Sequence, residues 1–405
     1  MTPPDGRGGS IAGACLGVYL ALIVGGYIAF DSAAAPAGRP STRDLAFFHA
    51  VNAATLTGFR TSIELDQRIL APLTSLALTL AGGMLSLVVG GMAVSRLLRL
   101  GHGDGRIVLA SAILLAAGTI VGASMVIDDQ RGPLHALLAG ATAVCNGGVV
   151  ASALPDARSF AVQAFLLPLA LLGGLGINVI IEIVDVITRR KTLSSHARVS
   201  LGGMALVYLA GTTLIFGLML VQPTRYPPPP DRDALESARR SLLHAHTLSA
   251  NSRTAGLPLH YVADSPRPVQ WLLIPLMAIG ACSAGTGGGL KVTALFAIIR
   301  GVRWSFAGRG SRLMGLAMAW LGIYLAVVGA CFAVLLHTER DLSAERLLFL
   351  AFSAVSNVGL SHDQVLIVGP GLIVLCVAML AGRLLPLAVL WWAVRTVDDA
   401  DLGVA

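Results

Sequence analysis

Residues 44–59 read DLAFFHAVNAATLTGF, an apolar segment over 44–54 followed by a short turn that contains a glycine. The same arrangement returns three times further along the chain. The four turn glycines are, in order, Gly58, Gly148, Gly256 and Gly359. They are separated by 90, 108 and 103 residues. A recurrence near 100 residues indicates an internal repeat, which has to be interpreted before any single motif.

The segments before these turns are too short to cross a membrane. They contain 11 to 16 residues and cover 44–54, 134–144, 235–250 and 345–355. A helix of that length reaches about 16–24 Å, whereas the hydrocarbon core is about 30 Å thick. Each segment is therefore predicted to re-enter on the side where it began. The turn after it is tolerable only where it lines a water-filled cavity or is buried in protein.

Longer hydrophobic runs flank each short segment. They lie near 11–30, 69–98, 106–127, 160–188, 198–222, 269–300, 313–336 and 364–395. The chain has 405 residues, of which 55% are hydrophobic and 13% charged, against about 25% charged in soluble domains. This composition excludes a disordered chain, a disulfide-rich secreted scaffold and an ordinary cytosolic enzyme. It predicts an all-α integral membrane protein with eight spanning helices and four re-entrant half-helices around a central pore.

The predicted repeats are 1–104, 105–197, 198–312 and 313–405. The run 269–300 contains the small-residue stretch 280–291, which would make a poor helix, so this span is predicted to be broken around a loop in the membrane. The stretch is not a phosphate-binding loop, because Leu290 precedes Lys291 and Val292 follows it. The alternative is a close packing site for a neighbouring helix.

The net charge of +7 is explained by the way the chain is oriented in the membrane. Three short polar breaks between spans carry eleven basic residues and one acid, Asp104, whereas the other polar segments carry fourteen basic and fifteen acidic residues. The basic breaks contain Arg96, Arg99, Arg106, Arg189, Arg190, Lys191, Arg198, Arg300, Arg303, Arg309 and Arg312. By the positive-inside rule these breaks are cytoplasmic, as are both termini, and the glycine turns face outward. No basic patch interleaved with aromatic residues supports nucleic-acid binding.

The five cysteines have no CxxC spacing and specify neither disulfides nor a zinc site. The N-terminus resembles a signal peptide, with Arg7, an apolar run over 11–30 and a row of alanines at 33–35. The run is long for a signal peptide, and the first repeat requires it as a helix. We therefore expect it to be retained.

Four half-helices around one axis would direct their C-terminal ends at one point, each with about half a negative charge. Glycine permits backbone conformations that turn several carbonyls inward. Carbonyls in that arrangement replace the hydration shell of a monovalent cation. The turns hold no ring of Asp or Glu. Any one of these glycines alone is better explained as a packing or capping residue, but four at matching places favour a filter.

These residues resemble the Trk/Ktr/HKT superfamily of potassium transporters, and most of all its Ktr-type membrane subunit. The resemblance covers essentially the whole chain. Its most specific parts are 252–256 (SRTAG), 357–361 (NVGLS), 280–291 (GACSAGTGGGLK) and, in the first turn, 57–59 (TGF). In such proteins each repeat supplies one filter segment, and an intramembrane loop beneath the filter gates the pore.

The resemblance implies two sets of site residues. The filter set is Thr57, Gly58, Asn146, Gly147, Gly148, Thr254, Ala255, Gly256, Asn357, Val358 and Gly359. The gate set is Ala281, Cys282, Ser283, Ala284, Gly285, Thr286, Gly287, Gly288, Gly289, Lys291 and Arg383. The resemblance also implies a homodimer in membrane lipid and a cytosolic nucleotide-binding regulatory subunit. Potassium is the substrate, and no cofactor is expected.

The chain departs from the family in its second turn. Family members usually have Asn-Asn-Ala-Gly-Phe where this chain has CNGGV over 145–149. The change leaves the preference for potassium over sodium open. Arg253 and Arg60 stand beside filter glycines, where a cation would repel the ion unless it pairs, for example with Glu64 or Asp66, or turns aside.

Arg383 is a lone charge near the middle of the last span. An unpartnered arginine at that depth costs about 2.5–3.5 kcal/mol on insertion scales. We expect Arg383 to face the pore axis and donate to carbonyls of the loop 281–288, holding the pore closed. The alternative is that it only ties helices together. Lys291 is expected to reach toward the cytoplasm, where Glu182 or Asp185 could pair with it or with the basic cluster at 189–191.

The sequence thus predicts potassium uptake across the cell inner membrane. A sodium-permeable or ion-coupled symporter of the same architecture remains open. A membrane-embedded enzyme would need converging acid, base or metal ligands at membrane depth, and the sequence shows none. A transporter with inverted repeats is disfavoured because the four repeats run in one orientation. Replacing Gly256 or Gly359 with serine should alter the ion preference.

Overall fold

The computed structural model describes residues 7–34, 43–61, 69–150, 154–189, 192–222, 234–255, 257, 259–306 and 312–402. Across these ranges the protein is helical, and the only β-type pairings are two isolated bridges, Thr61 with Val365 and Ile279 with Leu290. The predicted all-α membrane fold is confirmed. Six helices are long and apolar enough to span a membrane, and one bent pair adds a seventh candidate.

The N-terminal and C-terminal quarters of the chain share one helix pattern. The first contains α1 (Arg7–Ala34), α2 (Arg43–Ala54) and α3 (Leu70–Leu97). The last contains α12 (Arg312–Thr338), α13 (Ala344–Val355) and α14 (Pro370–Leu402). In each, two long helices enclose a short one, and the second long helix is continuous. The two groups lie against each other, since α14 packs on both α2 and α3.

The second group contains α4 (Asp104–Val126), the 3₁₀ turn η2 (Ile127–Asp129) and α5 (Pro133–Cys145). The π-helical turn η3 (Val162–Leu166), α6 (Leu167–Leu175) and α7 (Ile177–Arg189) follow. The sequence predicts one span over 160–188, and this is wrong in one respect: the helix bends by 100° at Gly176. Gly176 has φ +89°, and a Cβ atom placed there would overlap with the carbonyl oxygen of Ser283.

The third group contains α8 (Ser195–Val221), α9 (Ala234–Ala250), the π-helical turn η4 (Asn251–Ala255) and the 3₁₀ turn η5 (Val262–Asp264). It ends with α10 (Arg267–Ala278) and α11 (Val292–Phe306). The span predicted over 269–300 is broken as expected, because residues 279–291 form a loop between α10 and α11. The starts of α4, α8 and α12 lie close to the repeat boundaries predicted from the sequence.

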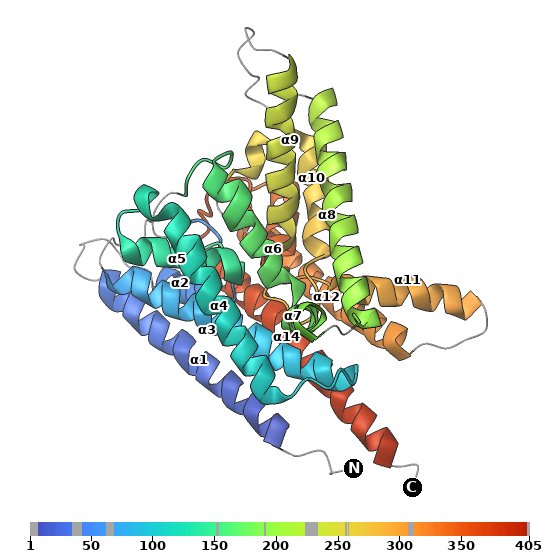
Figure 1. The fold of residues 1–405 in the computed structure, drawn as a ribbon. Coiled ribbons are helices and arrows are strands. Elements are labelled where there is room, and N and C mark those ends of the chain that lie inside the picture. Colours follow the sequence, from blue (N-terminus) through green and yellow to red (C-terminus); the bar gives the residue numbers. More distant parts are fainter. Residues whose placement is uncertain are drawn as a thin grey trace.

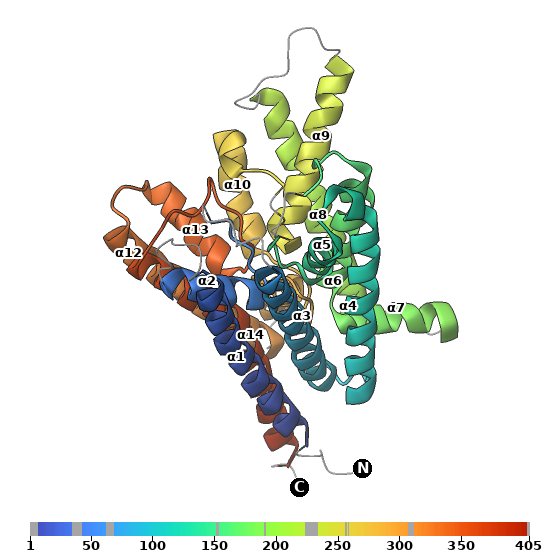
Figure 2. The same ribbon diagram turned by 90° about the vertical axis from the view of Figure 1, so that its left-hand side faces the viewer.

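The arrangement in space follows from these groups (Figure 1). The short helices α2 and α5 lie within the bundle, and the first residues of α1 and the last of α14 lie at the same end. After the bend, α7 runs sideways out of the bundle (Figure 2), and α11 does the same in Figure 1. The second and third groups therefore differ from the first and fourth in the second half of their last span.

Candidate ion filter and gate

Three of the short helices end in the same backbone motif. One or two residues after the helix, the backbone adopts a left-handed conformation, with φ +59° at Leu56, +59° at Asn146 and +49° at Asn357. The next amide reaches back five residues: for example, the amide of Thr57 donates to the carbonyl of Asn52 at 3.1 Å, and the other two helices repeat this bond. This is the Schellman cap, which satisfies carbonyls left free at a helix end.

A second left-handed residue follows two positions later in each of these turns. It is Gly58 (φ +85°), Gly148 (φ +62°) and Gly359 (φ +78°). A Cβ atom on Gly58 would overlap with the Cα atom of Gly148 and lie 2.7 Å from the carbonyl oxygen of Gly147. A Cβ atom on Gly359 would overlap with the carbonyl oxygen of Thr57. The first turn therefore lies directly against both the second and the fourth, with no room for a side chain.

The first and second turns are each held by a polar side chain from the short helix behind them. The side-chain oxygen of Asn52 accepts from the amides of Gly58 and Phe59, both at 2.9 Å, and its nitrogen donates to the Phe59 carbonyl at 3.0 Å. Thr142 donates its hydroxyl to the Val149 carbonyl at 2.5 Å. Sequence reasoning missed both residues, although both stand seven positions before the residue they bind.

The third turn is built differently. The short helix α9 passes into the π turn η4, in which Asn251 exchanges two hydrogen bonds of 2.6 Å with the backbone of Leu257. Gly256 lies outside the described residues, and so do the side chains of Thr254 and Ala255. The contribution of these three predicted filter residues therefore remains a prediction.

Arg253 is directed at backbone carbonyls of neighbouring segments. Its side chain is fully buried and donates to backbone carbonyls of Met204 at 2.9 Å, Gly280 at 3.3 Å and Ile279 at 3.5 Å. Its partners are carbonyls of α8 and of the chain leaving α10, so the positive charge is compensated without an acid. Arg60 lies over the ring of Tyr261, 4.9 Å from its centroid.

The loop 279–291 fits into the bend of the second group. Its two ends pair through the bridge between Ile279 and Leu290. The amides of Cys282 and Thr286 donate, each at 3.0 Å, to the carbonyls of Gly174 and Gly173. In return, the amide of Ile177 donates to the Ala284 carbonyl at 3.1 Å. The loop thus uses the backbone groups that the ends of α6 and α7 leave free.

Arg383 connects this loop to the first turn. It is 4% exposed and donates to the Thr286 carbonyl at 2.7 Å, to the Thr55 carbonyl at 2.9 Å and to the Ser86 hydroxyl at 3.1 Å. The structure therefore places Arg383 against a loop carbonyl, as expected from the sequence. It also gives Arg383 a second partner, the carbonyl of Thr55 in the first turn.

Lys291 does not reach an acid in the structure. Its ammonium group donates to the carbonyls of Gly287 and Gly288 in its own loop. The acids proposed as its partners are used elsewhere. Glu182 accepts from the amide and hydroxyl of Ser194, each at 2.8 Å. Asp185 binds Arg106 at 2.5 Å and Arg189 at 3.5 Å, so its predicted pairing with the basic cluster at 189–191 is confirmed and only the pairing with Lys291 is wrong. The correction has a geometric cause, because the bend at Gly176 carries α7 away from the loop.

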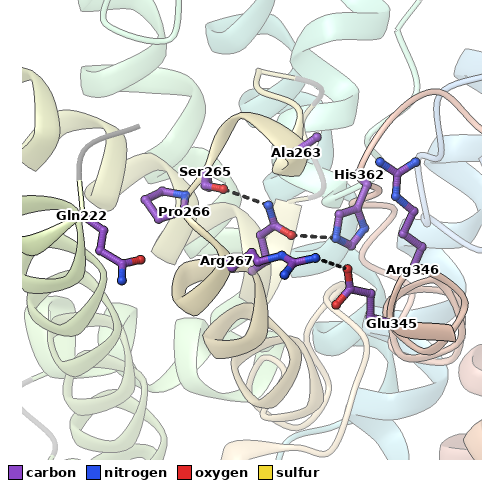
Figure 3. Close-up of a pocket in the computed structure, with 9 residues that line it drawn as sticks. Gln222, Ala263, Ser265, Pro266, Arg267, Glu345, Arg346 and His362 are labelled. Carbon is purple, nitrogen blue, oxygen red and sulfur yellow. Dashed lines mark hydrogen bonds and ion pairs between the residues drawn. The ribbon is translucent and has the colours of Figure 1, made fainter. Parts of the chain in front are cut away.

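The segments that follow the turns are joined to one another. The amide of Val365, after the fourth turn, donates to the Arg60 carbonyl, and the amides of Val262 and Ala263 donate to the carbonyls of Ser361 and His362. A polar cavity of about 430 Å³ lies beside this junction (Figure 3). It is lined by Gln222, Ala263, Ser265, Pro266, Arg267, Gln270, Glu345, Arg346 and His362.

The cavity's polar groups are mostly paired with one another. His362 donates through Nε2 to the side-chain oxygen of Gln270 at 3.0 Å, and Arg267 forms an ion pair of 3.4 Å with Glu345. Burial lowers the pKa of His362 below its usual value, and the nearby Arg346 lowers it further. Among the described residues, no group of three or more His, Cys, Asp or Glu could hold a metal ion.

The described helices define a multi-pass α-helical membrane protein. No protein-family model matches the chain. The chain is 27% identical over 284 residues to the Ktr system potassium uptake protein B of Vibrio alginolyticus, a match that covers 66% of this chain. The matched region spans 60% of the length of that relative.

A solved structure supports the same assignment. The potassium transporter TrkH from Vibrio parahaemolyticus matches with a TM-score of 0.65 and 21% identity, over 85% of this chain and 76% of that one. The two similarities confirm the resemblance to the Trk/Ktr superfamily of membrane subunits. Both matched proteins are named as potassium transport proteins, and neither name describes an enzyme.

Proposed function

We propose that the protein takes up potassium across the cell inner membrane through a filter of backbone carbonyls. The observation that carries the proposal is the contact of three turns that share one left-handed backbone pattern, with Gly58 against Gly148 and Gly359 against Thr57. The turns at 54–60, 144–150, 252–257 and 355–361 contain no Asp or Glu. Carbonyl dipoles, helped by the C-terminal ends of the short helices, would then coordinate the ion.

The loop 281–289 acts as the gate in this proposal, with Lys291 and Arg383 as its supports. It lies among the inner ends of the turns, because a Cβ atom on Gly288 would overlap with the Ser356 carbonyl. Arg383 is buried between this loop and the first turn, where its charge opposes passage of a cation. An ion leaving the filter inward would require the loop to move.

The assembly and orientation follow from the same resemblance and from charge. The protein would form a homodimer and bind a cytosolic nucleotide-binding regulatory subunit at its basic inner face. Support comes from the described basic residues at the ends of α3, α7 and α11, namely Arg96, Arg189 and Arg303. These are the ends expected to face the cytoplasm, together with both termini. Each of the four repeat units, 1–104, 105–197, 198–312 and 313–405, would then begin and end on the cytoplasmic side.

A sodium-permeable or ion-coupled variant of this transporter is the second candidate. Its support is the second turn, where Val149 replaces the aromatic residue of the family and only Thr142 holds the backbone. In the first turn, Asn52 makes three hydrogen bonds. A more weakly supported turn would discriminate less between ions of different size.

Rubidium uptake in cells that lack their own potassium uptake systems tests the proposal. We expect uptake with the wild type, more of it with a coexpressed regulatory subunit, and a loss with Gly359→Ala. Gly329→Ala is the matched control, because Gly329 lies in a spanning helix with open space around it. An inserted wild-type protein that moves no rubidium under either condition would contradict the proposal.

A further inference from the structure

Two buried asparagines occupy the same place in different repeats. Asn146 and Asn357 are the left-handed residues that follow α5 and α13, and each is 1% exposed. Each side-chain amide donates to a carbonyl of the second span of its own repeat, Asn146 to Ala170 at 3.0 Å and Asn357 to Met379 at 2.8 Å. The position in the first repeat is Leu56, whose side chain has no donor.

The same amide of each asparagine makes a second hydrogen bond, and here the two differ. Asn357 donates to the hydroxyl of Thr57, at 3.1 Å, which lies in the first turn. Asn146 donates to the hydroxyl of Thr286, at 2.6 Å, which lies in the loop 279–291. One contact therefore joins two filter segments, whereas its counterpart joins a filter segment to the loop.

Thr286 uses all of its polar groups. It is fully buried, its amide donates to the Gly173 carbonyl, and its carbonyl accepts from Arg383. Its hydroxyl accepts from Asn146 and lies 3.5 Å from the Val144 carbonyl, to which it donates. A loop displacement that removes Thr286 would leave the Asn146 amide with one partner fewer in a buried place, which is unfavourable.

We propose that the Asn146–Thr286 hydrogen bond couples the gate to the filter, so that the loop position sets how tightly the second turn is held. The proposal rests on the potassium filter and gate argued above. Coupling between two sites is reciprocal in binding free energy. An ion in the filter that requires the Asn146 geometry therefore favours the closed loop, and an open loop loosens the second turn. Asn146 and Thr286 are positioning residues in this account.

The test measures ion binding on purified full-length protein, as the rise in unfolding temperature caused by rubidium and, separately, by sodium. A ligand that binds the folded state raises that temperature. Thr286→Val removes the hydroxyl and keeps the shape, and Thr286→Ser keeps the hydroxyl. The matched control is Thr119→Val, since Thr119 is a buried threonine of α4 whose hydroxyl has no partner.

We expect Thr286→Val to reduce the ratio of rubidium to sodium affinity by about three- to tenfold, the range expected for one lost hydrogen bond. Thr286→Ser should restore the ratio, and Thr119→Val should leave it unchanged. A merely structural role for Thr286 would lower stability without changing the ion ratio, and that result would overturn the coupling. If rubidium stabilises neither the wild type nor any variant, and uptake is absent, the filter itself is refuted and the coupling with it.

Discussion

The first and fourth groups keep their second span as one helix, whereas the second and third groups break it. In α3 and α14 the chain continues past Gly82 and Gly382 without interruption. In the second group the helix stops at Leu175, and in the third the chain leaves α10 after Ala278. The break in the third group makes the loop, and the break in the second makes the space and the free carbonyls that receive it. The two breaks therefore form one structural unit, in which the loop of the third group packs into the bend of the second.

The four glycines at this level share an arrangement that explains the difference. A Cβ atom on Gly82, Gly173 or Gly382 would overlap with the last carbonyls of α2, α5 or α13. Gly280 holds the matching place in the third group, but a Cβ atom there would overlap with the Gly288 carbonyl of the loop. In the other three groups, the glycine lets the second span pack closely against its short helix. In the third group, the glycine packs against the loop instead.

A substitution at the bend, at Gly176, should have the largest effect and tests whether the broken spans of the second and third groups depend on each other. Gly176→Ala adds a Cβ atom where the Ser283 carbonyl lies and also forces a left-handed alanine, at φ +89°. Gly101→Ala is the matched control, with φ +74° and open space around it. The control substitution should lower the free energy of unfolding only by the strain of a left-handed alanine, about 1–2 kcal/mol. We expect a clearly larger fall in unfolding temperature for Gly176→Ala, with loss of gated uptake. Equal falls would show that the loop does not press on the bend.

How far the sequence predicts this fold can be judged from these breaks. The loop over 280–291 was predictable because small residues are dense there, and the glycine turns were predictable because they repeat. The bend was missed because hydropathy continues evenly across 160–188. Its signal was finer: a Gly-Gly-Leu-Gly run over 173–176, followed by Asn178, Glu182 and Asp185 on one helix face. The direction of Arg253 was not predictable, because its acceptors are backbone carbonyls from two other segments.

Arg383 gives the next largest expected effect. Arg383→Ala removes the hydrogen bonds that hold Thr286 and Thr55 together. Hydrogen bonds to a charged group contribute about 1.5–3 kcal/mol each, so rubidium uptake without a regulatory subunit should rise at least about tenfold. Arg395→Ala, which changes an exposed arginine of the same helix, should leave uptake unchanged. Unchanged uptake in a well-inserted Arg383→Ala protein would mean that the arginine only ties helices together.

The side chains that support the first and second turns, Asn52 and Thr142, allow a comparison with smaller expected effects. Asn52→Leu removes three hydrogen bonds and Thr142→Val removes one. We expect both to lower the preference for rubidium over sodium in competition uptake, the first by about tenfold or more and the second by about threefold. A larger loss from Thr142→Val than from Asn52→Leu would contradict the view that side-chain supports set the filter geometry.

The smallest expected effect concerns pH at the junction beside the polar cavity. The folded-state pKa of His362 is below its usual value because of burial, so the unfolded chain binds the proton more readily. The contribution of His362 to the free energy of unfolding should therefore be fully present above about pH 6.5 and be lost as the pH drops below that value. Thermal unfolding from pH 7.5 to 5 should show this slope, and His362→Gln should reduce it. An unchanged slope in the variant would assign the effect to other groups.

The central claim is that backbone carbonyls of the turns, and not acidic side chains, hold the ion. Anomalous diffraction from crystals of the full chain soaked in rubidium tests this most directly. The account predicts a peak between the turns, within coordination distance of the carbonyls of Thr57, Gly147 and Val358. A peak at carboxylates elsewhere in the membrane region, with the space between the turns empty, would contradict it.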